Sequence, residues 1–403
     1  MTKEKSTVPR LRFPGFTDAW KQRKLGEVVY RSNITSSNKT LPRLEFEDIN
    51  SGTGTLNKDI RQKIYDSRKG LEFKEEDILF GKLRPYLKKW WFAEYKGIAV
   101  GDFWNLKSDI WDNRFLFTYV QSNSFQVVAN DTSGTKMPRS DWKLVSNSIA
   151  IFPTLPEQEA IGSFFSDLDQ LITLHQRKLD DVKELKKALL QKMFPKGNGN
   201  DFPELRFPEF TDAWKQRKFS DLAEVRRGLT YSPSAIRSHG VRVLRSSNIN
   251  EDTFVFGEDD VFVDKSVVKI PLVEEGDILI TSANGSSRLV GKHSIIKGLP
   301  SNSAIHGGFM LLASSKVPCF LNAFMSSTWY HKFIGLYVAG GNGAIGNLNK
   351  SDLDEQIVLV PTLPEQEAIG SFFSDLDQLI TLHQRQLDHL KLLKKALLQQ
   401  MFI

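Results

Sequence analysis

The chain has 403 residues, of which 40% are apolar and 25% are charged, a composition typical of a globular protein with two or three domains. It contains no apolar run of the roughly 18 residues that a membrane span requires, and its first residues (MTKEKSTVPRLR) lack the apolar core of a secretory signal. Cys319 is the only cysteine, so an intrachain disulfide and a multi-cysteine zinc site are excluded. We therefore expect a cytoplasmic protein without a membrane segment, whose net charge of +6 is compatible with a polyanionic partner such as DNA.

The chain begins with a short block that occurs twice. Residues 9–24 (PRLRFPGFTDAWKQRK) return as residues 203–218 (PELRFPEFTDAWKQRK) with two differences. After the first copy, residues 25–150 contain short apolar runs separated by Gly, Asn and Ser, which predicts a mixed α/β domain. The expected elements are strands over residues 77–80 and 97–100 and a helix over residues 114–130.

Two loops of this first domain are rich in basic residues. FGKLRPYLKKWW (residues 80–91) mixes them with aromatic residues, and SGTKMPRS covers residues 133–140. Arg can read guanine edges, Asn can read adenine edges, and Lys and Ser hold phosphates, so such loops are candidates for contact with DNA. For any single residue a solvated loop is the simpler explanation, and the case rests on similar loops recurring in the second half. The candidates here are Lys82, Arg84, Lys88, Lys89, Thr135, Lys136 and Arg139.

Residues 153–194 are typical of a long amphipathic helix. It opens with TLPE, in which Thr154 is a candidate N-cap and Glu157 takes the third position of a capping box. Apolar residues recur every seven positions with further apolar neighbours, which gives a stripe wider than a two-helix seam. About 38 residues at a rise of 1.5 Å give roughly 57 Å, too long for one small domain.

The helix returns as residues 361–402, with five differences from the first copy. We expect the two copies to pair antiparallel if the halves are related by a pseudo-two-fold axis. His175 and His383 lie on the seam, where we expect them to fix the register. The alternative is a metal site, for which no further ligand pattern is visible.

Residues 219–358 form the second variable domain. EGDILI (residues 275–280) corresponds to EEDILF (residues 75–80) at an offset of 200. The expected elements are strands over residues 241–244, 277–280 and 307–314 and a helix over residues 319–337. The candidates for DNA contact are Arg245, Ser246, Asn248, Ser282, Asn284, Ser286, Arg288, Lys292, Asn342, Asn347 and Lys350.

Signals for catalysis are weak. Residues 341–346 match GxGxxG, but a helix is expected before them instead of the strand that a dinucleotide site needs. Asp77 with Glu94 and Lys96 is loosely similar to a nuclease set, yet the second half has Ser294 where an acid would be needed. We therefore expect no catalytic residues, no metal site and no cofactor in this chain.

The motifs together resemble the specificity subunit of bacterial type I restriction–modification systems. They are TLPEQEAIG opening a long helix in each half, EDIL or GDIL followed by a basic or Ser/Asn-rich loop, FGKLRPYLKK, and WKQRK near the start of each half. Thr154 and Thr362 stand where the family motif begins PLPEQ, and the resemblance covers essentially the whole chain.

The resemblance implies an α+β (mixed α/β) protein with two target recognition domains, separated by two long antiparallel coiled-coil helices in a pseudo-two-fold duplication. Each domain reads one half of a bipartite, asymmetric DNA target, and the helices set the spacer and bind two methyltransferase subunits. Restriction and translocase subunits complete the complex, and S-adenosylmethionine, ATP and Mg²⁺ belong to those partners. The alternative is a non-catalytic coiled-coil scaffold whose globular domains bind proteins.

The expected boundaries are residues 1–152 for the repeat segment and first target recognition domain, 153–195 for the central helix, 196–360 for the linker, repeat segment and second domain, and 361–403 for the C-terminal helix. The expected partner-binding residues on the helices are Ile161, Phe165, Leu168, Ile172, Leu179, Ile369, Phe373, Leu376, Ile380 and Leu387.

Overall fold

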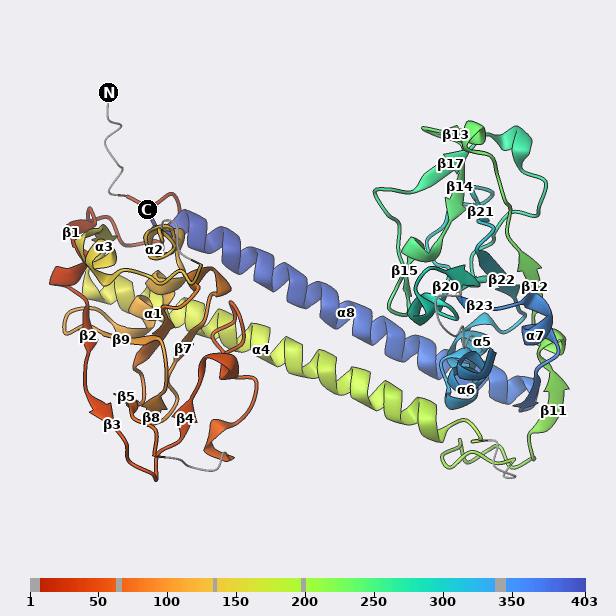
Figure 1. Ribbon diagram of the computed structural model, residues 1–403, viewed down its shortest axis with the longest axis horizontal. Coiled ribbons are helices and arrows are strands. Elements are labelled where there is room, and N and C mark those ends of the chain that lie inside the picture. Colours follow the sequence, from red (N-terminus) through yellow and green to blue (C-terminus); the bar gives the residue numbers. More distant parts are fainter. Residues whose placement is uncertain (1–7, 63–66, 133–135, 197–200, 338–345) are drawn as a thin grey trace. The chain divides into compact units, whose positions relative to one another are not determined.

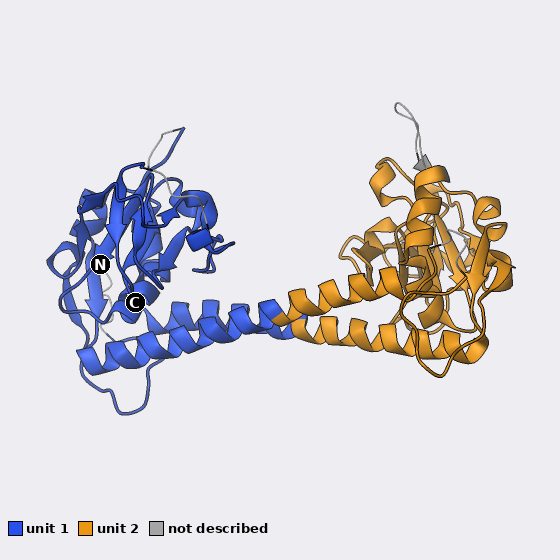
Figure 2. Cartoon of the chain, turned by 90° about the horizontal axis from the view of Figure 1, so that it is seen from below, with its two compact units in different colours: residues 1–177, 384–403 blue, residues 178–383 orange. Residues whose placement is uncertain are grey.

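The computed structural model describes residues 8–62, 67–132, 136–196, 201–337 and 346–403. The chain divides into two compact units: unit 1 consists of Met1–Arg177 with Gln384–Ile403, and unit 2 of Lys178–His383 (Figure 2). Two long helices, α4 (Leu155–Lys192) and α8 (Leu363–Met401), each contribute residues to both units. Among the described residues, no helix is both long and apolar enough to cross a membrane.

Unit 1 contains two four-stranded sheets (Figure 1). The first is antiparallel, with the order β2 (Tyr30–Ser32), β9 (Phe103–Lys107), β6 (Ile78–Gly81) and β7 (Trp90–Phe92). The second has the order β3 (Thr35–Ser36), β5 (Gly70–Phe73), β8 (Gly97–Ala99) and β4 (Arg43–Leu44), in which only β8 and β4 run parallel. The other elements are the pair β1 (Lys21–Lys24) and β10 (Ile149–Phe152) and the helices α1 (Asn113–Gln121), α2 (Asn123–Ala129) and α3 (Trp142–Asn147).

Unit 2 repeats the first sheet of this plan, but the strand order of its second sheet differs and further short strand pairs are added. Its antiparallel sheet has the order β12 (Glu224–Arg227), β22 (Met310–Ser314), β18 (Ile278–Thr281) and β20 (His293–Ile295). Its second sheet has the order β13 (Ile236–Arg237), β17 (Val261–Val263), β14 (Val241–Leu244) and β21 (Ala304–His306). The two-stranded sheets are β11 (Lys215–Lys218) with β24 (Ile357–Val360), β15 (Ile249–Asn250) with β16 (Thr253–Phe254), and β19 (Ala283–Asn284) with β23 (Gly346–Asn347). The helices are α5 (Pro318–Met325), α6 (Thr328–Tyr337) and α7 (Lys350–Asp354).

Strand pairing fixes which residues of the two units are equivalent. Leu83 pairs with Arg139 in unit 1, and Ala283 pairs with Asn347 in unit 2. Since β6 and β18 align at the offset of 200 that the sequence indicates, Leu83 corresponds to Ala283. Their partners, Arg139 and Asn347, therefore correspond as well. The mixed α/β duplication expected from the sequence is confirmed.

The predicted strands are confirmed, except that the strand expected over residues 307–314 begins only at Met310. Both predicted helices of the variable domains are wrong at their centres. The helix expected over residues 114–130 is interrupted at Ser122, whose backbone is extended (φ −68°, ψ 156°) and whose hydroxyl accepts a hydrogen bond from Phe125 N at the start of α2. The helix expected over residues 319–337 is interrupted after α5, which ends at Met325. Serine competes for backbone hydrogen bonds and therefore favours a new N-terminus over a continuous helix.

Within each unit, α4 and α8 lie antiparallel and are joined by a partly buried ion pair. In unit 1, Lys394 Nζ lies 2.6 Å from Asp169 Oδ1 and 2.6 Å from Gln121 Oε1. In unit 2, Lys186 Nζ lies 2.6 Å from Asp377 Oδ1. Burial raises the pKa of Asp169 above its ordinary value, although Lys394 opposes the shift. Because the same two positions recur 208 residues apart, the repeat places one ion pair in each unit and fixes the helix register.

The first turn of each long helix is anchored by a buried arginine–glutamate pair. Glu157 is fully buried, and its carboxylate accepts hydrogen bonds from the Arg12 guanidinium at 2.6 and 2.7 Å. In unit 2, Arg206 binds Glu365 in the same way, at 2.7 and 2.7 Å. The capping box expected at Glu157 is therefore wrong, because this glutamate is committed to an arginine of the short repeated block.

Glycine allows the same helices to cross other helices closely. A Cβ atom on Gly162 would lie 2.7 Å from Phe115 N in α1, and one on Gly370 would lie 2.6 Å from Phe320 N in α5. Real Cβ atoms do not approach backbone so closely, so a larger residue would force the helices apart. The arginine, the glutamate and the glycine of the two repeated blocks thus build one joint twice.

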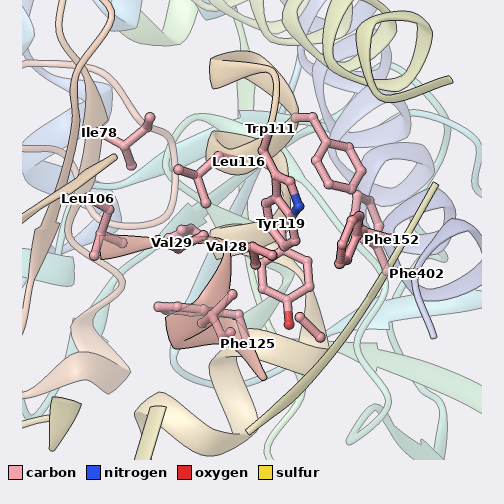
Figure 3. Packing of buried hydrophobic residues seen from close by; sticks show 14 of the residues in the cluster. Val28, Val29, Ile78, Leu106, Trp111, Leu116, Tyr119, Phe125, Phe152 and Phe402 are labelled. Atoms are coloured by element: carbon pink, nitrogen blue, oxygen red, sulfur yellow. The ribbon is translucent and has the colours of Figure 1, made fainter. Parts of the chain in front are cut away.

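The ends of the long helices complete the hydrophobic cores. Phe402, directly after α8, packs in unit 1 against Phe115, with ring centroids 5.7 Å apart, and among Trp111, Tyr119 and Phe152 (Figure 3). The other labelled members of this cluster in Figure 3 are Val28, Val29, Ile78, Leu106, Leu116 and Phe125. In unit 2 the equivalent residue, Phe194, packs against Phe373, Trp214, Phe320 and Phe324.

Candidate nucleic-acid interface

Three loops of unit 1 meet where β6 ends and β7 and β9 begin. Lys82 N donates to Asp102 O at 2.9 Å, and Ser140 N donates to Lys82 O at 2.9 Å. Arg84 N donates to Pro138 O at 2.7 Å. These bonds bring residues 82–89 and 136–140, far apart in sequence, to one end of the sheet. The structure therefore places Lys82, Arg84, Lys88 and Arg139 in one cluster.

A strained turn presents three side chains of this cluster. The 3₁₀ turn Pro85–Leu87 is flanked by Arg84 (φ 48°) and Lys88 (φ 53°), both in the left-handed region that residues other than glycine rarely adopt. Its backbone is held by Ser51 Oγ, which donates to Leu87 O at 2.5 Å. Arg84, Tyr86 and Lys88 are exposed, and within the described chain neither Arg84 nor Lys88 forms an ion pair. Strain of this kind is typical of functional positions.

The remaining candidates of unit 1 are arranged differently. Lys89 Nζ donates to Ile49 O and lies over the Phe46 ring, so its charge is used within the fold. Arg139 Nη2 lies 3.0 Å from Asp102 Oδ2. Burial would raise the pKa of Asp102, but its hydrogen bond with Arg139 and the nearby Lys82 outweigh burial and lower it. Lys136 is exposed, and Thr135 lies outside the described residues.

Unit 2 brings equivalent loops together with fewer cations. Ser282 N donates to Phe309 O at 2.9 Å, and Leu348 N donates to Ser282 O at 2.7 Å. Asn284 Nδ2 donates to Ser246 Oγ at 3.2 Å. Phe309, which the sequence analysis missed, is 74% exposed beside this cluster. The pair Gly307–Gly308 directly before it is a signal for a tight turn, whereas the sequence analysis expected a strand over residues 307–314.

Several candidates of unit 2 serve the fold. Asn248 is fully buried, and its side chain binds Arg245 N, Val255 O and Asp260 Oδ1 at 2.8–3.0 Å. Arg245 Nη2 lies 3.1 Å from Asp259 Oδ2, and Lys350 pairs with Asp354. Ser282 is buried, Ser246 and Lys292 are half-buried, and Ser286, Arg288 and Asn347 are exposed. Asn342 and most of the GxGxxG match lie outside the described residues.

The helix residues expected to bind partners lie mainly inside the two units. The buried ones are Ile161, Phe165, Leu168, Leu179, Ile369, Phe373 and Leu387, whereas Ile172, Leu376 and Ile380 are half-buried. The exposed leucines on these helices are Leu155, Leu171, Leu174, Leu185, Leu363, Leu379, Leu382, Leu392 and Leu393. In the described residues, no group of three His, Cys, Asp or Glu side chains is arranged to hold a metal ion.

Because His306, at the edge of the unit 2 cluster, is buried, we expect the free energy of unfolding to depend on pH. Burial lowers its pKa to about 4, and its Nε2 atom lies 3.2 Å from Arg226 O. In the unfolded state the histidine pKa is near 6.5, so between about pH 4 and pH 6.5 the unfolded state binds more protons than the folded state. Stability is therefore complete above about pH 6.5 and falls as the pH drops toward 4, with a loss of about 2 kcal/mol from His306 at pH 5.

We expect His306→Gln to reduce the difference between urea-unfolding free energies at pH 7.5 and pH 5.0. His239→Gln, an exposed control, should leave it unchanged. Part of the pH dependence of stability should remain in His306→Gln, because burial also lowers the pKa of His293. An unaltered pH difference in His306→Gln would contradict the assignment.

Comparisons with known proteins identify relatives of the whole chain. The sequence model of the type I restriction modification DNA specificity domain matches twice, over residues 17–184 and 211–392. The chain is similar to the type I restriction enzyme MjaVIII specificity subunit of Methanocaldococcus jannaschii, with 23% identity over 320 residues that cover 76% of this chain and 74% of that protein.

Two solved structures show a similar fold. The S subunit of a type I restriction–modification system from M. genitalium aligns over 98% of this chain and 99% of its own, with a TM-score of 0.63 and 13% identity. A chain from a structure that describes complex assembly and conformational transition of the type I R-M system aligns over 94% of this chain and 96% of its own, with a TM-score of 0.51 and 16% identity.

Proposed function

The chain belongs to the family of the type I restriction modification DNA specificity domain, and from this membership we propose that it is the DNA sequence-recognition subunit of a type I restriction–modification complex. Each globular domain reads one half of a bipartite, asymmetric target. The chain itself is not catalytic. Methylation and cleavage belong to methyltransferase and restriction subunits, which bring S-adenosylmethionine, ATP and Mg²⁺.

The observation that carries this proposal is a repeated framework with different side chains at equivalent loop positions. The equivalent pairs are Lys82 and Ser282, Arg84 and Asn284, and Arg139 and Asn347. The Arg84 guanidinium matches guanine edges, and the amides of Asn284 and Asn347 match adenine edges. One scaffold that presents different donors and acceptors in each copy is suited to reading two different half-sites.

The long helices support two further roles. Their length, roughly 57 Å at 1.5 Å per residue, suits a spacer between half-sites that lie about one DNA turn apart. The two copies of one sequence suit two copies of one methyltransferase subunit. We place the contact with the methyltransferase subunits on the expected helix residues together with the exposed leucines, such as Leu171 and Leu379. The exposed apolar side chains would touch the partner, and the buried ones would hold the helix surface in position.

Methylome sequencing tests the proposal directly. The chain and its methyltransferase subunit would be expressed in a host without other modification systems. We expect one new methylated motif with two short defined halves around a gap of fixed length. If the two proteins form a complex and no new motif is methylated, the proposed function is wrong.

Lengthening both helices should change the gap. One heptad inserted at the same position of α4 and α8 adds about 10.5 Å by helical rise, equivalent to about three base pairs. We expect the methylated motif to keep both halves and gain about three undefined positions. A motif with the original gap would show that the helices do not set the spacer.

Substitutions in the loops should separate base reading from phosphate binding. Arg84→Ala and Arg288→Ala should each cost about 1–3 kcal/mol of binding to the specific site and relax one base position, because an arginine that binds a base edge discriminates among bases. Lys88→Ala should weaken specific and scrambled duplexes alike. Binding titrations of the assembled complex check this, and equal losses on both duplexes for all three variants would refute the base contacts.

A further inference from the structure

Unit 1 carries an open cationic groove beside the loop cluster. A cavity of about 680 Å³ is lined by Arg31, Lys82, Trp104, Arg139, Trp142 and Lys143 among others. A second cavity of about 460 Å³ shares Arg31 and Trp142 with it and adds Lys24 and Glu27. Because the two cavities share these walls, they form one groove along β2, β9 and α3.

Arg31 lines both cavities of this groove, and its Nε atom has no hydrogen-bonding partner among the described residues. Its guanidinium carbon lies 5.0 Å from the ring centroid of Trp142 and 5.7 Å from that of Trp104. The Nε atom is buried and forms no hydrogen bond within the described chain. Burial lowers the pKa of Arg31, and Asp141 only partly opposes this shift. Arg31 forms no ion pair within the described chain, so its guanidinium charge is available to an anion in the groove.

The acids near the groove offset only part of its positive charge, because fewer acids than cations line it. Asp141 Oδ1 accepts a hydrogen bond from Lys143 N at 2.8 Å at the start of α3, and Glu27 lies 3.8 Å from Arg23. Asp102 binds Arg139 and lies 3.5 Å from Lys82. Lys143 is exposed and free of ion pairs in the described structure. Cations therefore outnumber uncommitted acids along the groove.

The positions of unit 2 that are equivalent to Arg31, Lys82, Arg139 and Lys143 carry no cations. Strand register places Val225 opposite Ala313 as Arg31 is placed opposite Leu106, so Val225 is the equivalent of Arg31. The remaining equivalents are Ser282 for Lys82, Leu311 for Trp104, Asn347 for Arg139, Lys350 for Trp142 and Ser351 for Lys143. The groove is therefore a property of unit 1 and not of the shared framework.

We infer that this groove binds a backbone phosphate of duplex DNA, through Arg31, Lys143, Lys82 and Arg139, and that unit 1 anchors the DNA backbone at this site while unit 2 has no equivalent anchor. The groove offers donors that match phosphate oxygens, and it adjoins the loops proposed to read bases. The inference rests on the proposed function, since it names a contact of the same interface. On binding, phosphate replaces Asp102 as the partner of Lys82 and Arg139.

The salt dependence of binding tests this contact without knowledge of the target sequence. The full chain, assembled with its methyltransferase subunits, would be titrated with a 40-base-pair duplex of scrambled sequence at several salt concentrations. We expect Arg31→Gln and Lys143→Gln each to weaken binding several-fold and to reduce the slope of log K against log salt by about 1, as loss of one phosphate contact does. Arg31→Lys, which keeps the charge, should retain most of the slope.

Matched variants separate this contact from general loss of charge. Lys74→Gln removes one exposed charge near the start of β6, the strand that ends at the groove, and should leave the slope unchanged. Ser351→Ala changes the position in unit 2 that is equivalent to Lys143 and should have no effect. Equal losses in Lys74→Gln and Lys143→Gln, or unchanged binding in Arg31→Gln and Lys143→Gln, would overturn the inference. A wild-type complex that does not bind duplex DNA would refute the proposed function itself.

A titration with inorganic phosphate distinguishes DNA from a free anion as the source of the phosphate. We expect inorganic phosphate at millimolar concentration to bind weakly and to leave the affinity for duplex unchanged at constant ionic strength. Submillimolar binding of inorganic phosphate that Arg31→Gln abolishes, without a change in the DNA salt slope, would assign the groove to a free anion and overturn the DNA contact. Lys143 is exposed, so its variant remains informative if Arg31→Gln fails to fold.

Discussion

Replacing Arg206 by alanine is expected to destabilise unit 2 by about 3–5 kcal/mol, because it leaves a fully buried carboxylate without its partner. Glu365 has no exposed surface, and both of its oxygens accept hydrogen bonds from Arg206. Among the described side chains, Trp214 Nε1, at 3.4 Å from Oε1, remains as a donor after the substitution. A carboxylate in such a site cannot regain its hydration without opening the joint between α8 and the rest of unit 2.

Hydrogen exchange of the full chain measures this loss unit by unit. We expect faster exchange in β18 and β22 of unit 2 and little change in β6 and β9 of unit 1. Lys196→Ala is the matched control, since Lys196 forms an exposed pair with Glu204 in the same segment and its loss should not be measurable. The double variant Arg206→Met with Glu365→Leu should recover part of the stability. Unchanged exchange in Arg206→Ala would show that the pair is not needed for this joint.

Phe402→Ala is expected to destabilise unit 1 by about 3–5 kcal/mol, because it removes an aromatic ring from the centre of the core. The Phe402 ring lies within 5.7–6.4 Å of the rings of Phe115, Tyr119, Phe165 and Trp20. Residues that precede α4 and residues of α4 itself would line the resulting cavity. The substitution also weakens the attachment of the end of α8 to unit 1.

Urea unfolding monitored by tryptophan fluorescence suits this variant, because six of the eight tryptophans belong to unit 1. Leu392→Ala is the control on the same helix, since its side chain is 66% exposed and its loss should change stability by less than about 0.5 kcal/mol. Phe194→Ala should produce the corresponding loss in unit 2. A midpoint for Phe402→Ala equal to that of Leu392→Ala would contradict the role of Phe402 in closing the core.

The repeated segments made the long helices predictable, and tertiary contacts made their details unpredictable. TLPE located the first turns, and α4 and α8 begin at Leu155 and Leu363. The role of Glu157 was missed because its partner, Arg12, lies in another repeated block. The apolar stripe is wider than a two-helix seam because residues such as Phe165 face the core of a globular domain as well as the other helix.

The loop cluster was predicted only in part, again because tertiary contacts decide which side chains meet. Basic composition identified Arg84 and Arg139, which the structure brings to the same sheet end. Composition did not identify Arg31 or Trp142, because a single arginine on a short strand and a tryptophan at a helix start carry no local signal. Their proximity arises only when β2 and α3 pack on the same sheet. Asn248 shows the opposite case, since its local context suggested base contact and its contacts serve the fold.

Unit 1 is built from two stretches that lie far apart in the sequence, so it cannot be completed early during synthesis on the ribosome. Met1–Arg177 is translated before unit 2, whereas Gln384–Ile403, which supplies Phe402 to the core, is translated after it. At about 5–20 residues per second, the nascent chain carries an incomplete unit 1 for on the order of 10–40 s while unit 2 is made. Unit 2 thus has all its residues first, which reverses the usual order in which N-terminal domains fold first. Until α8 is finished, the apolar pocket for Phe402 is open to chaperones and to neighbouring nascent chains.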